Sequence, residues 1–93
     1  MHFAIYCTDK ADSQALRQQT RPAHLDFLSA AGERVVLAGP LLDDSAESVI
    51  GSLIVLDADD KESAERFAAD DPYALAGLFE NVTIRHFRKV IPA

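Results

Sequence analysis

The sequence has few of the features on which secreted, membrane-bound or nucleic-acid-binding proteins depend. Its single cysteine, Cys7, cannot form an intramolecular disulfide, so nothing in the chain requires an oxidising compartment. No apolar run approaches the length of a membrane span, and the N-terminal residues MHFAIYCTDK lack the basic and apolar regions of a signal peptide. These absences predict a cytoplasmic protein without a membrane partner.

Positive charge is also scarce. Nine Lys and Arg stand against fifteen Asp and Glu, which gives a net charge of −6. An acidic chain repels phosphate backbones, so we expect no nucleic-acid partner. Many of the acids fall between Asp57 and Asp71, where they are most simply interpreted as a solvated helix face.

The composition is otherwise that of a globular protein. Of the 93 residues, 48% are hydrophobic and 26% are charged, the balance of a folded chain rather than a disordered one. This length fits one domain, residues 1–93, with a small core. No internal repeat or low-complexity tract divides the chain.

Hydrophobic periodicity predicts six main elements. Runs of β-branched and apolar residues indicate strands, and apolar residues three and four positions apart indicate helices. In the first helix this spacing places Leu16, Ala23, Phe27 and Ala30 on one apolar face. The predicted strands are 2–7, 34–42, 49–56 and 81–91, and the predicted helices are about 12–31 and 59–69.

A proline interrupts the first predicted helix. Pro22 cannot donate a backbone hydrogen bond, so the helix is expected to kink or restart there. Thr20 would then be the new N-cap, and His24 would lie in the first turn of the second piece. The positive end of the helix dipole would disfavour a protonated imidazole at that place and leave His24 able to accept a proton.

Capping residues and a change of pattern mark three further boundaries. Asp59 and Glu62 resemble a capping box at the start of the second helix. Asp71 before Pro72 is typical of an N-cap followed by the first helical position. The last strand changes hydrophobic phase in its middle, which predicts a bulge or a strand that outruns its sheet.

The order strand, helix, strand, strand, helix, strand predicts an α+β, ferredoxin-like βαββαβ fold. In that fold two helices cover one face of an antiparallel sheet. Residues 49–56 are almost continuously apolar, a pattern typical of a strand that is covered on both faces. Because the helices cover only one face, we predict a homodimer in which the second subunit covers the other.

Few residues indicate a known chemistry from spacing alone. The acidic stretch after residue 57 is no calcium loop, because Lys61 and Glu62 stand where an acidic or amide residue and a glycine are needed. The three histidines are isolated, which argues against zinc. Gly51-Ser52 lacks the frame of a serine-hydrolase nucleophile. We therefore expect no metal, no organic cofactor and no serine nucleophile.

Structural roles also explain the remaining candidates. His24 would then be an exposed helical residue, and Asp71 would only cap a helix. Cys7 lies in a predicted strand, where a thiol is usually buried and inert. Tyr6 and Tyr73 could line a pocket or pack in the core with the hydroxyl at its edge.

Several short segments together resemble a known family. They are Arg21-Pro22-Ala23-His24-Leu25, Ala38-Gly39-Pro40, Gly51-Ser52, Asp70-Asp71-Pro72-Tyr73, Ala76-Gly77, Glu80-Asn81-Val82 and Phe87-Arg88-Lys89-Val90. Their order and spacing are similar to those of the YciI-like (YCII) family of small bacterial proteins over nearly the whole chain. The resemblance implies a dimeric α/β-barrel with an active site on His24 and Asp71. It also implies an enzyme family, one member of which removes chloride from a hydroxylated aromatic ring.

The residues and the resemblance join in one hypothesis. Asp71 against the His24 imidazole would hold its tautomer and stabilise the imidazolium, which would give cofactor-free acid–base catalysis. A small phenol, enol or lactone would suit this site, with Ser52 orienting an oxygen, Arg21 pairing with a substrate anion and Tyr73 lining the pocket. Two alternatives remain open, a non-catalytic dimeric module that binds a small ligand and a purely structural hydrogen bond between His24 and Asp71. Exposure of the pair in an open cleft would favour catalysis or binding.

Overall fold

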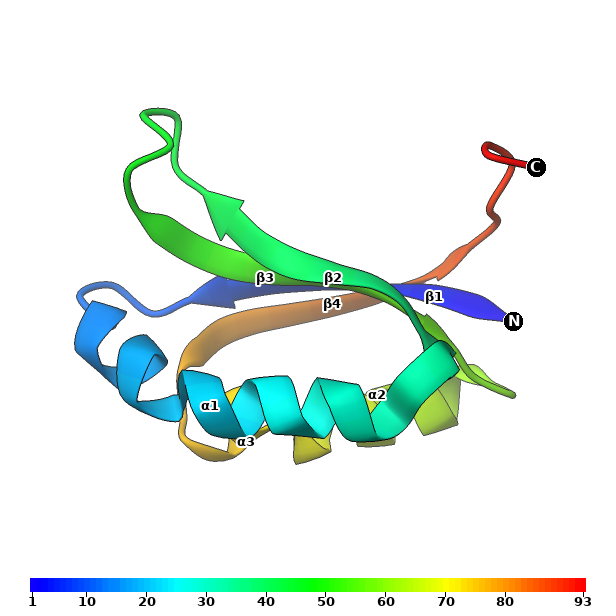
Figure 1. Ribbon diagram of the computed structural model, residues 1–93, viewed down its shortest axis with the longest axis horizontal. Helices are drawn as coiled ribbons and strands as arrows, with labels where there is room; N and C mark the ends of the chain where they lie inside the picture. The colour runs from blue at the N-terminus through cyan, green and yellow to red at the C-terminus, as the bar shows by residue number, and fades with distance from the viewer.

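Four antiparallel strands form one sheet in the order β2-β3-β1-β4, and the helices lie on one of its faces (Figure 1). The computed structural model describes all residues, 1–93. It confirms the α+β, ferredoxin-like order, with a short extra helix before the last strand. The elements are β1 (His2–Asp9), α1 (Gln14–Ala31), a 3₁₀ turn (Gly32–Arg34), β2 (Val35–Leu42), β3 (Val49–Asp57), α2 (Lys61–Asp70), α3 (Pro72–Leu75) and β4 (Phe79–Phe87).

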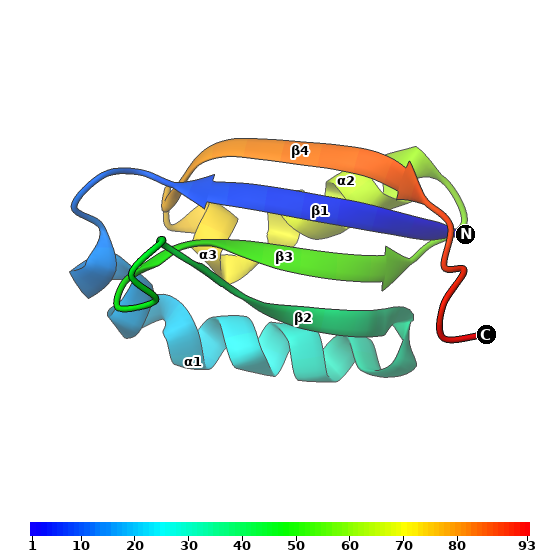
Figure 2. The ribbon, with the colours of Figure 1, turned by 90° about the horizontal axis from the view of Figure 1, so that it is seen from above.

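The core lies between the sheet and the helices. Alternate residues of the two central strands point toward the helices, and the register places Ile5 opposite Ile54 and Phe3 opposite Leu56. All four side chains are buried and belong to one apolar cluster with Phe67 of α2. Figure 2 shows α1 following the β2 edge of the sheet while α2 lies behind β4 and β1.

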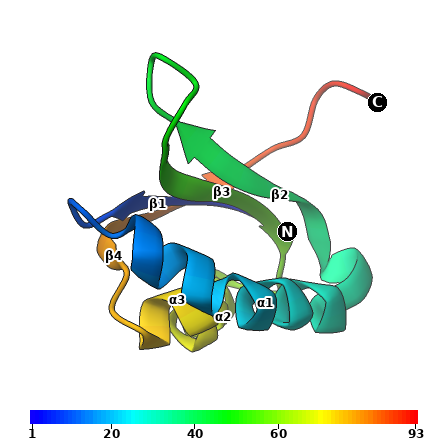
Figure 3. The same ribbon diagram turned by 60° about the vertical axis from the view of Figure 1, so that its left-hand side comes forward.

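The opposite face of the sheet carries no helix. It presents Tyr6, Leu37 and Phe87, which are 51%, 53% and 45% exposed. Between them lie two β3 residues, Leu53, which is half-buried, and Val55, which is 5% exposed. The β2–β3 loop and the C-terminal segment rise on this open side, away from the helices (Figure 3). The continuous apolar pattern of β3 therefore has two causes. One side of the strand packs on the helices, and the other side is apolar although no helix covers it.

Helix α1 continues through Pro22, so of the two predicted outcomes the helix kinks and does not restart. Figure 1 shows the first turns of α1 inclined to the remainder. Pro22 leaves the Gln18 carbonyl without its helical donor, and both residues are exposed, so water can satisfy it. The Thr20 hydroxyl donates to the Leu16 carbonyl (2.8 Å) and caps nothing. His24 therefore lies in mid-helix, where the dipole argument does not apply.

The apolar face that spacing predicted for α1 is only partly correct. Phe27 is half-buried and packs against the core, whereas Ala23 and Ala30 are exposed. The buried residues of the helix are Arg17 and His24. Both are polar, and both find hydrogen-bond partners from other elements, which makes their burial tolerable.

The starts of the two later helices follow their capping residues. Asp60, not Asp59, caps α2, and its side chain accepts a hydrogen bond from the Ser63 backbone N–H (2.8 Å). The predicted start is therefore early by one position. Asp71 caps α3 and Pro72 occupies its first turn, as predicted.

The last strand is shorter than predicted. It ends at Phe87, and residues 88–93 lie outside the sheet. The irregularity in its pairing falls at Thr8/Asp9 of β1, near the start of β4 rather than in its middle. The change of hydrophobic phase is a change of face, since Ile84 packs on the core and Phe87 lies on the open side. No helix in the structure has both the length and the apolarity needed to cross a membrane.

Candidate active site

A histidine from α1 and the aspartate that caps α3 form a buried pair. The Nδ1 atom of His24 lies 2.8 Å from Oδ1 of Asp71. The same oxygen accepts the Tyr73 backbone N–H at 2.9 Å, so the capping bond also fixes the carboxylate. His24 is 7% exposed and Asp71 1%. The cap predicted from the Asp-Pro sequence is thus also the partner of the histidine.

This geometry assigns the proton of the imidazole. A carboxylate can only accept hydrogen bonds, so Nδ1 of His24 must be the donor and Nε2 is left as the acceptor of the neutral ring. Nε2 has no partner within the protein, and no buried side-chain nitrogen or oxygen is left unsatisfied. Nε2 therefore reaches solvent. Asp71 holds the tautomer in which His24 can take a proton at this atom.

A tyrosine forms the floor beside the histidine. The Tyr73 ring stacks on the imidazole of His24, with 4.0 Å between centroids and 20° between planes. The guanidinium of Arg17 lies 4.5 Å from the centroid of the Tyr73 ring. Burial raises the pKa of Tyr73, against the opposing effect of the nearby arginine charges. Its hydroxyl therefore stays protonated at neutral pH.

Arg17 connects the helix to the ends of two strands. Its Nε and Nη2 donate to both carboxylate oxygens of Asp9 (2.7 and 3.1 Å). Nη2 also donates to the Ser52 hydroxyl (2.8 Å) and to the Gly51 carbonyl (3.0 Å). Desolvation acts to lower the pKa of Arg17, but the hydrogen bond and charge of Asp9 outweigh it and raise the pKa. Arg17 is a fixed cation, because Asp9, Ser52 and Gly51 hold its Nε and Nη2 atoms.

Sequence reasoning missed Arg17 and Asp9. A signal was present, because Arg17, Arg21 and His24 are four and then three positions apart and so share one helix face. Apolar periodicity does not detect this face of the helix, because its three residues are polar. For Asp9, at the end of a strand, no local signal exists.

The predicted site residues gather around one small pocket. Its volume is about 200 Å³, and it is lined by Arg17, Arg21, His24, Ser52 and Tyr73 together with Leu25, Leu28 and residues 38–40 of β2. Asp71 lies behind His24 and does not line it. Arg21 is exposed and takes part in none of the ion pairs of the protein.

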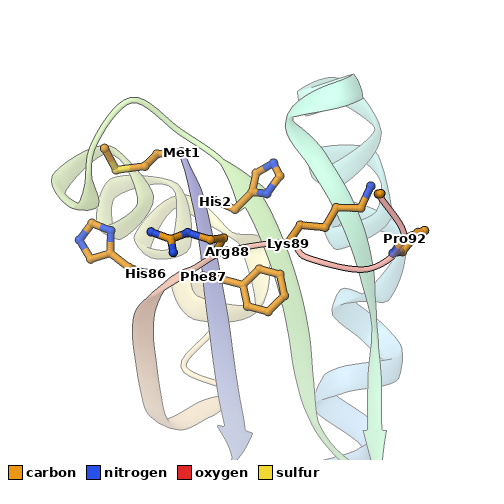
Figure 4. Close-up of a pocket in the computed structure, with 8 residues that line it drawn as sticks. Met1, His2, His86, Phe87, Arg88, Lys89 and Pro92 are labelled. Atoms are coloured by element: carbon orange, nitrogen blue, oxygen red, sulfur yellow. The ribbon is translucent and has the colours of Figure 1, made fainter.

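A larger pocket, of about 810 Å³, lies at the chain ends and contains none of these residues. Figure 4 shows His2 and Phe87 beside the C-terminal segment that carries Lys89 and Pro92. The two histidines there, His2 and His86, make no side-chain hydrogen bond to an acid. Nowhere in the chain do three or more His, Cys, Asp or Glu side chains come together in a way that could hold a metal ion.

We predict that the Cys7 thiol is unreactive in the folded protein. Burial, with the nearby charges of Asp71 and Asp9, raises its pKa from 9.0 to about 12. At pH 8 the thiolate fraction should then be about 10³-fold lower than in the unfolded chain. Alkylation by iodoacetamide should be slower than in the unfolded chain by the same factor. Above pH 9 the Cys7 thiol ionises in the unfolded chain but not in the folded protein. The free energy of unfolding should therefore fall as the pH rises further.

The control for this experiment is an exposed thiol on the same fold. Ser29 lies on the exposed side of α1, so Ser29→Cys in a Cys7→Ala background should react at the rate of the unfolded chain. Equal rates for native Cys7 and for that control would contradict the prediction.

Three bacterial proteins are similar to this chain over nearly its whole length. It is 37% identical over 97 residues to "Protein YciI" of Escherichia coli O6:H1 and of Shigella flexneri, covering 97% of this chain and 99% of each relative. An uncharacterized protein of Haemophilus influenzae is 31% identical over the same shares of both chains.

Solved structures agree with this relationship. The 5-chloro-2-hydroxyhydroquinone dehydrochlorinase TftG from Burkholderia phenoliruptrix, in complex with 2,5-dihydroxybenzoquinone, matches with a TM-score of 0.86 and 26% identity over 95% of this chain and 94% of that one. A protein of Arabidopsis thaliana matches with a TM-score of 0.50 and 9% identity over 99% and 97%, a likeness of fold alone. The sequence matches the YCII-related domain over residues 1–88. The chain therefore belongs to the YCII-related domain family.

Proposed function

We propose that the protein is a cofactor-free enzyme that uses His24 and Asp71 for acid–base chemistry on a small phenolic, enol or lactone-like substrate. The observation that carries the proposal is the free Nε2 of His24 at a pocket wall, with Nδ1 held by Asp71 at 2.8 Å. A general base needs an accessible acceptor atom in a fixed tautomer, and this arrangement supplies both.

In the proposed reaction Nε2 of His24 takes a proton from the substrate and later returns it. Asp71 stabilises the imidazolium that forms, because the negative carboxylate lies at hydrogen-bond distance from Nδ1. Stacking on Tyr73 keeps the ring from turning. Proton transfer of this kind contributes on the order of 10²–10⁴-fold in rate.

The size and charge of the pocket narrow the substrate. A cavity of ~150 Å³ accommodates benzene, so about 200 Å³ accommodates one ring with a few substituents. Arg21 is the one cation of the pocket without an ion-pair partner, and it is placed to pair with a substrate anion. The single-ring hydroxyquinone bound by the dehydrochlorinase TftG supports the same class of ligand.

Turnover of a panel of single-ring phenols, hydroquinones, enols and lactones tests the proposal. We expect at least one compound to be converted, at a rate that depends on His24 as the general base. Saturable binding of these compounds without conversion of any would instead support the non-catalytic ligand-binding module. Conversion that His24→Ala leaves unchanged would dismiss the proposed base.

We also propose that the protein is a homodimer that uses the open sheet face. Tyr6, Leu37 and Phe87 expose about half of their side chains there, and apolar residues gathered on one face mark an interaction site. A second copy of the same face would bury them.

The substitution Leu37→Glu is expected to weaken this dimer. A carboxylate buried without a partner costs several kcal/mol, so the dimer dissociation constant should rise on the order of 100-fold in sedimentation equilibrium. Leu75→Glu is the matched control, because Leu75 is 73% exposed on α3 in the helix layer. A wild-type monomer at micromolar concentration would refute the dimer.

A cytoplasmic location is the remaining part of the proposal. It rests on the single, buried Cys7, which forms no disulfide and needs no oxidising compartment. Cell fractionation of the native host tests it, and recovery with secreted proteins would contradict it.

A further inference from the structure

The positive charge of this acidic protein is concentrated in its last residues. Residues 81–93 contain three of the nine Lys and Arg, namely Arg85, Arg88 and Lys89, and no Asp or Glu. Residues 1–80 contain the other six together with all fifteen acids, so the two parts of the chain carry charges of +3 and −9. A positive segment in a protein of net charge −6 creates a local surface that attracts anions.

Basic side chains surround the larger pocket, of about 810 Å³, which we call the chain-end pocket. Arg88 and Lys89 line it together with His2 and His86, and no Asp or Glu does so. Figure 4 shows His86 and Arg88 on one side of strand β1, and His2 and Lys89 on the other. Hydrogen-bond donors therefore reach the pocket from both sides of the strand.

The two cations of this pocket have no partner inside the protein. Arg88 and Lys89 are exposed and take part in none of its ion pairs. The nearby N-terminal ammonium is by contrast bound to the Asp57 carboxylate at 2.9 Å. A guanidinium and an ammonium are the side-chain groups that pair most strongly with phosphate and carboxylate oxygens. Both groups are therefore available to an anionic ligand.

The remainder of the pocket offers an apolar surface on a fixed base. Met1 and Phe87 line it, and Phe87 is 45% exposed. The Met1 carbonyl accepts a hydrogen bond from the Ala58 N–H (2.8 Å), and the His86 ring lies 4.7 Å from the Phe3 ring between centroids. These contacts hold the start of β1 and the end of β4 in place. A ring of a ligand can pack on Phe87 while its anionic group meets the cations.

We propose that the chain-end pocket binds a small organic phosphate, with the phosphate held by Arg88 and Lys89 and an apolar or aromatic remainder against Phe87. A phosphate carries nearly two negative charges and three strong acceptor oxygens, so it can engage several basic groups at once. The pocket volume lies within the range of about 300–1,000 Å³ that is usual for small-molecule sites. None of the residues proposed for acid–base chemistry lines it, so this ligand is distinct from the proposed substrate.

The chain-end pocket lies at one end of the open sheet face. Figure 1 shows the N-terminus and the C-terminal segment together at that end. Phe87 belongs both to the pocket and to the open face, so the ligand would lie at the border of the proposed dimer surface. Binding is therefore measured on the full chain in the oligomeric state that it adopts in solution.

Isothermal titration calorimetry with 1-naphthyl phosphate tests the proposal, with 1-naphthol and inorganic phosphate as its two fragments. We expect saturable binding of one molecule per chain, and weaker binding of either fragment alone. Raising the ionic strength from about 0.01 M to about 0.15 M should weaken the binding, because salt screens exposed charges.

The double variant Arg88→Gln/Lys89→Gln locates the site. Its dissociation constant for 1-naphthyl phosphate should rise on the order of tenfold, the combined effect of two exposed ion pairs. Lys10→Gln/Lys61→Gln is the matched control, because it removes the same charge from two other exposed positions. This control should keep the wild-type affinity. All four side chains are exposed, so both double variants should keep the wild-type melting temperature.

Three results would overturn the inference. They are no saturable binding of 1-naphthyl phosphate, equal losses of affinity in the two double variants, and a loss in Arg21→Gln but not in Arg88→Gln/Lys89→Gln, which would place the phosphate in the small pocket. Binding that depends on Arg88 and Lys89 would support the inference even where no compound of the enzyme panel is converted.

Discussion

Replacing His24 by alanine is expected to lower kcat on a true substrate by about 10²–10⁴-fold, the range that general acid–base catalysis contributes. The variant removes the acceptor atom Nε2 and leaves the pocket lining otherwise in place. KM should change much less than kcat, because the base acts in the transition state more than in binding. Steady-state kinetics of the wild-type protein and of His24→Ala on one substrate measure the effect.

Two further variants show whether the histidine acts through its aspartate. Asp71→Asn retains an oxygen that can cap the Tyr73 N–H but removes the charge that stabilises the imidazolium, so kcat should again fall while the fold persists. His2→Ala changes a histidine outside the small pocket and should leave kcat unchanged. If His24→Ala lowered the melting temperature and left kcat as it was, the hydrogen bond would be structural only.

Placing alanine at Gly51 is expected to destabilise the protein by about 3 kcal/mol or more, at the upper end of the cost of overpacking. A Cβ at this position would collide with the carbonyl oxygen of Cys7, which belongs to the backbone of the neighbouring strand and cannot move aside. The strands β1 and β3 would have to separate where the Gly51 carbonyl also accepts from Arg17. Urea denaturation of the purified variant measures the loss.

Gly39→Ala is the matched control for this clash. Gly39 belongs to β2 and lies opposite Leu53 of β3. A Cβ at Gly39 would meet no atom within 4 Å. Its effect on stability should stay within about 0.5 kcal/mol, as for other substitutions that meet no structural obstacle. Equal losses for the two variants would show that the close approach at Gly51 is not the cause.

The sequence patterns predicted the order of elements because the strands and the second helix bury apolar residues at regular spacing. Ile54 and Leu56 alternate with residues of the open face, and Phe67 marks the inner side of α2. The Asp71-Pro72 pair predicted the start of α3, because helix capping is decided by residues that are neighbours in the sequence. Such local signals suffice wherever one face of an element is simply apolar.

The same reasoning went wrong where tertiary contacts decide. Pro22 was expected to kink or restart α1, and only the kink occurs, because its one lost hydrogen bond falls on the exposed side of a helix that packing holds together. Arg17 was missed although its spacing places it on one helix face with His24, because its burial depends on Asp9 and Ser52, which belong to two different strands. Only the fold shows which acid pairs with this arginine.

The candidate site was predicted in part. His24 and Asp71 were named from the family resemblance and from the Asp-Pro cap, and the structure places them 2.8 Å apart. Ser52 was named as a group that orients an oxygen, and in the structure its hydroxyl accepts a hydrogen bond from Arg17 (2.8 Å). The shape of the pocket could not be predicted, because it arises from side chains of α1, β2 and β3 that only the folded chain brings together.

The two walls of the pocket differ in how freely they can change. His24, Ser52 and Tyr73 are buried, His24 and Tyr73 stack on each other and Ser52 is bonded to Arg17, so larger side chains at these positions would disturb the packing. Ala38 and Pro40 belong to the edge strand β2, are small and exposed, and lie opposite Ile54 and Ser52. Substitutions in an edge strand can therefore change which ligand fits the pocket, while the buried His24–Asp71 pair stays as it is.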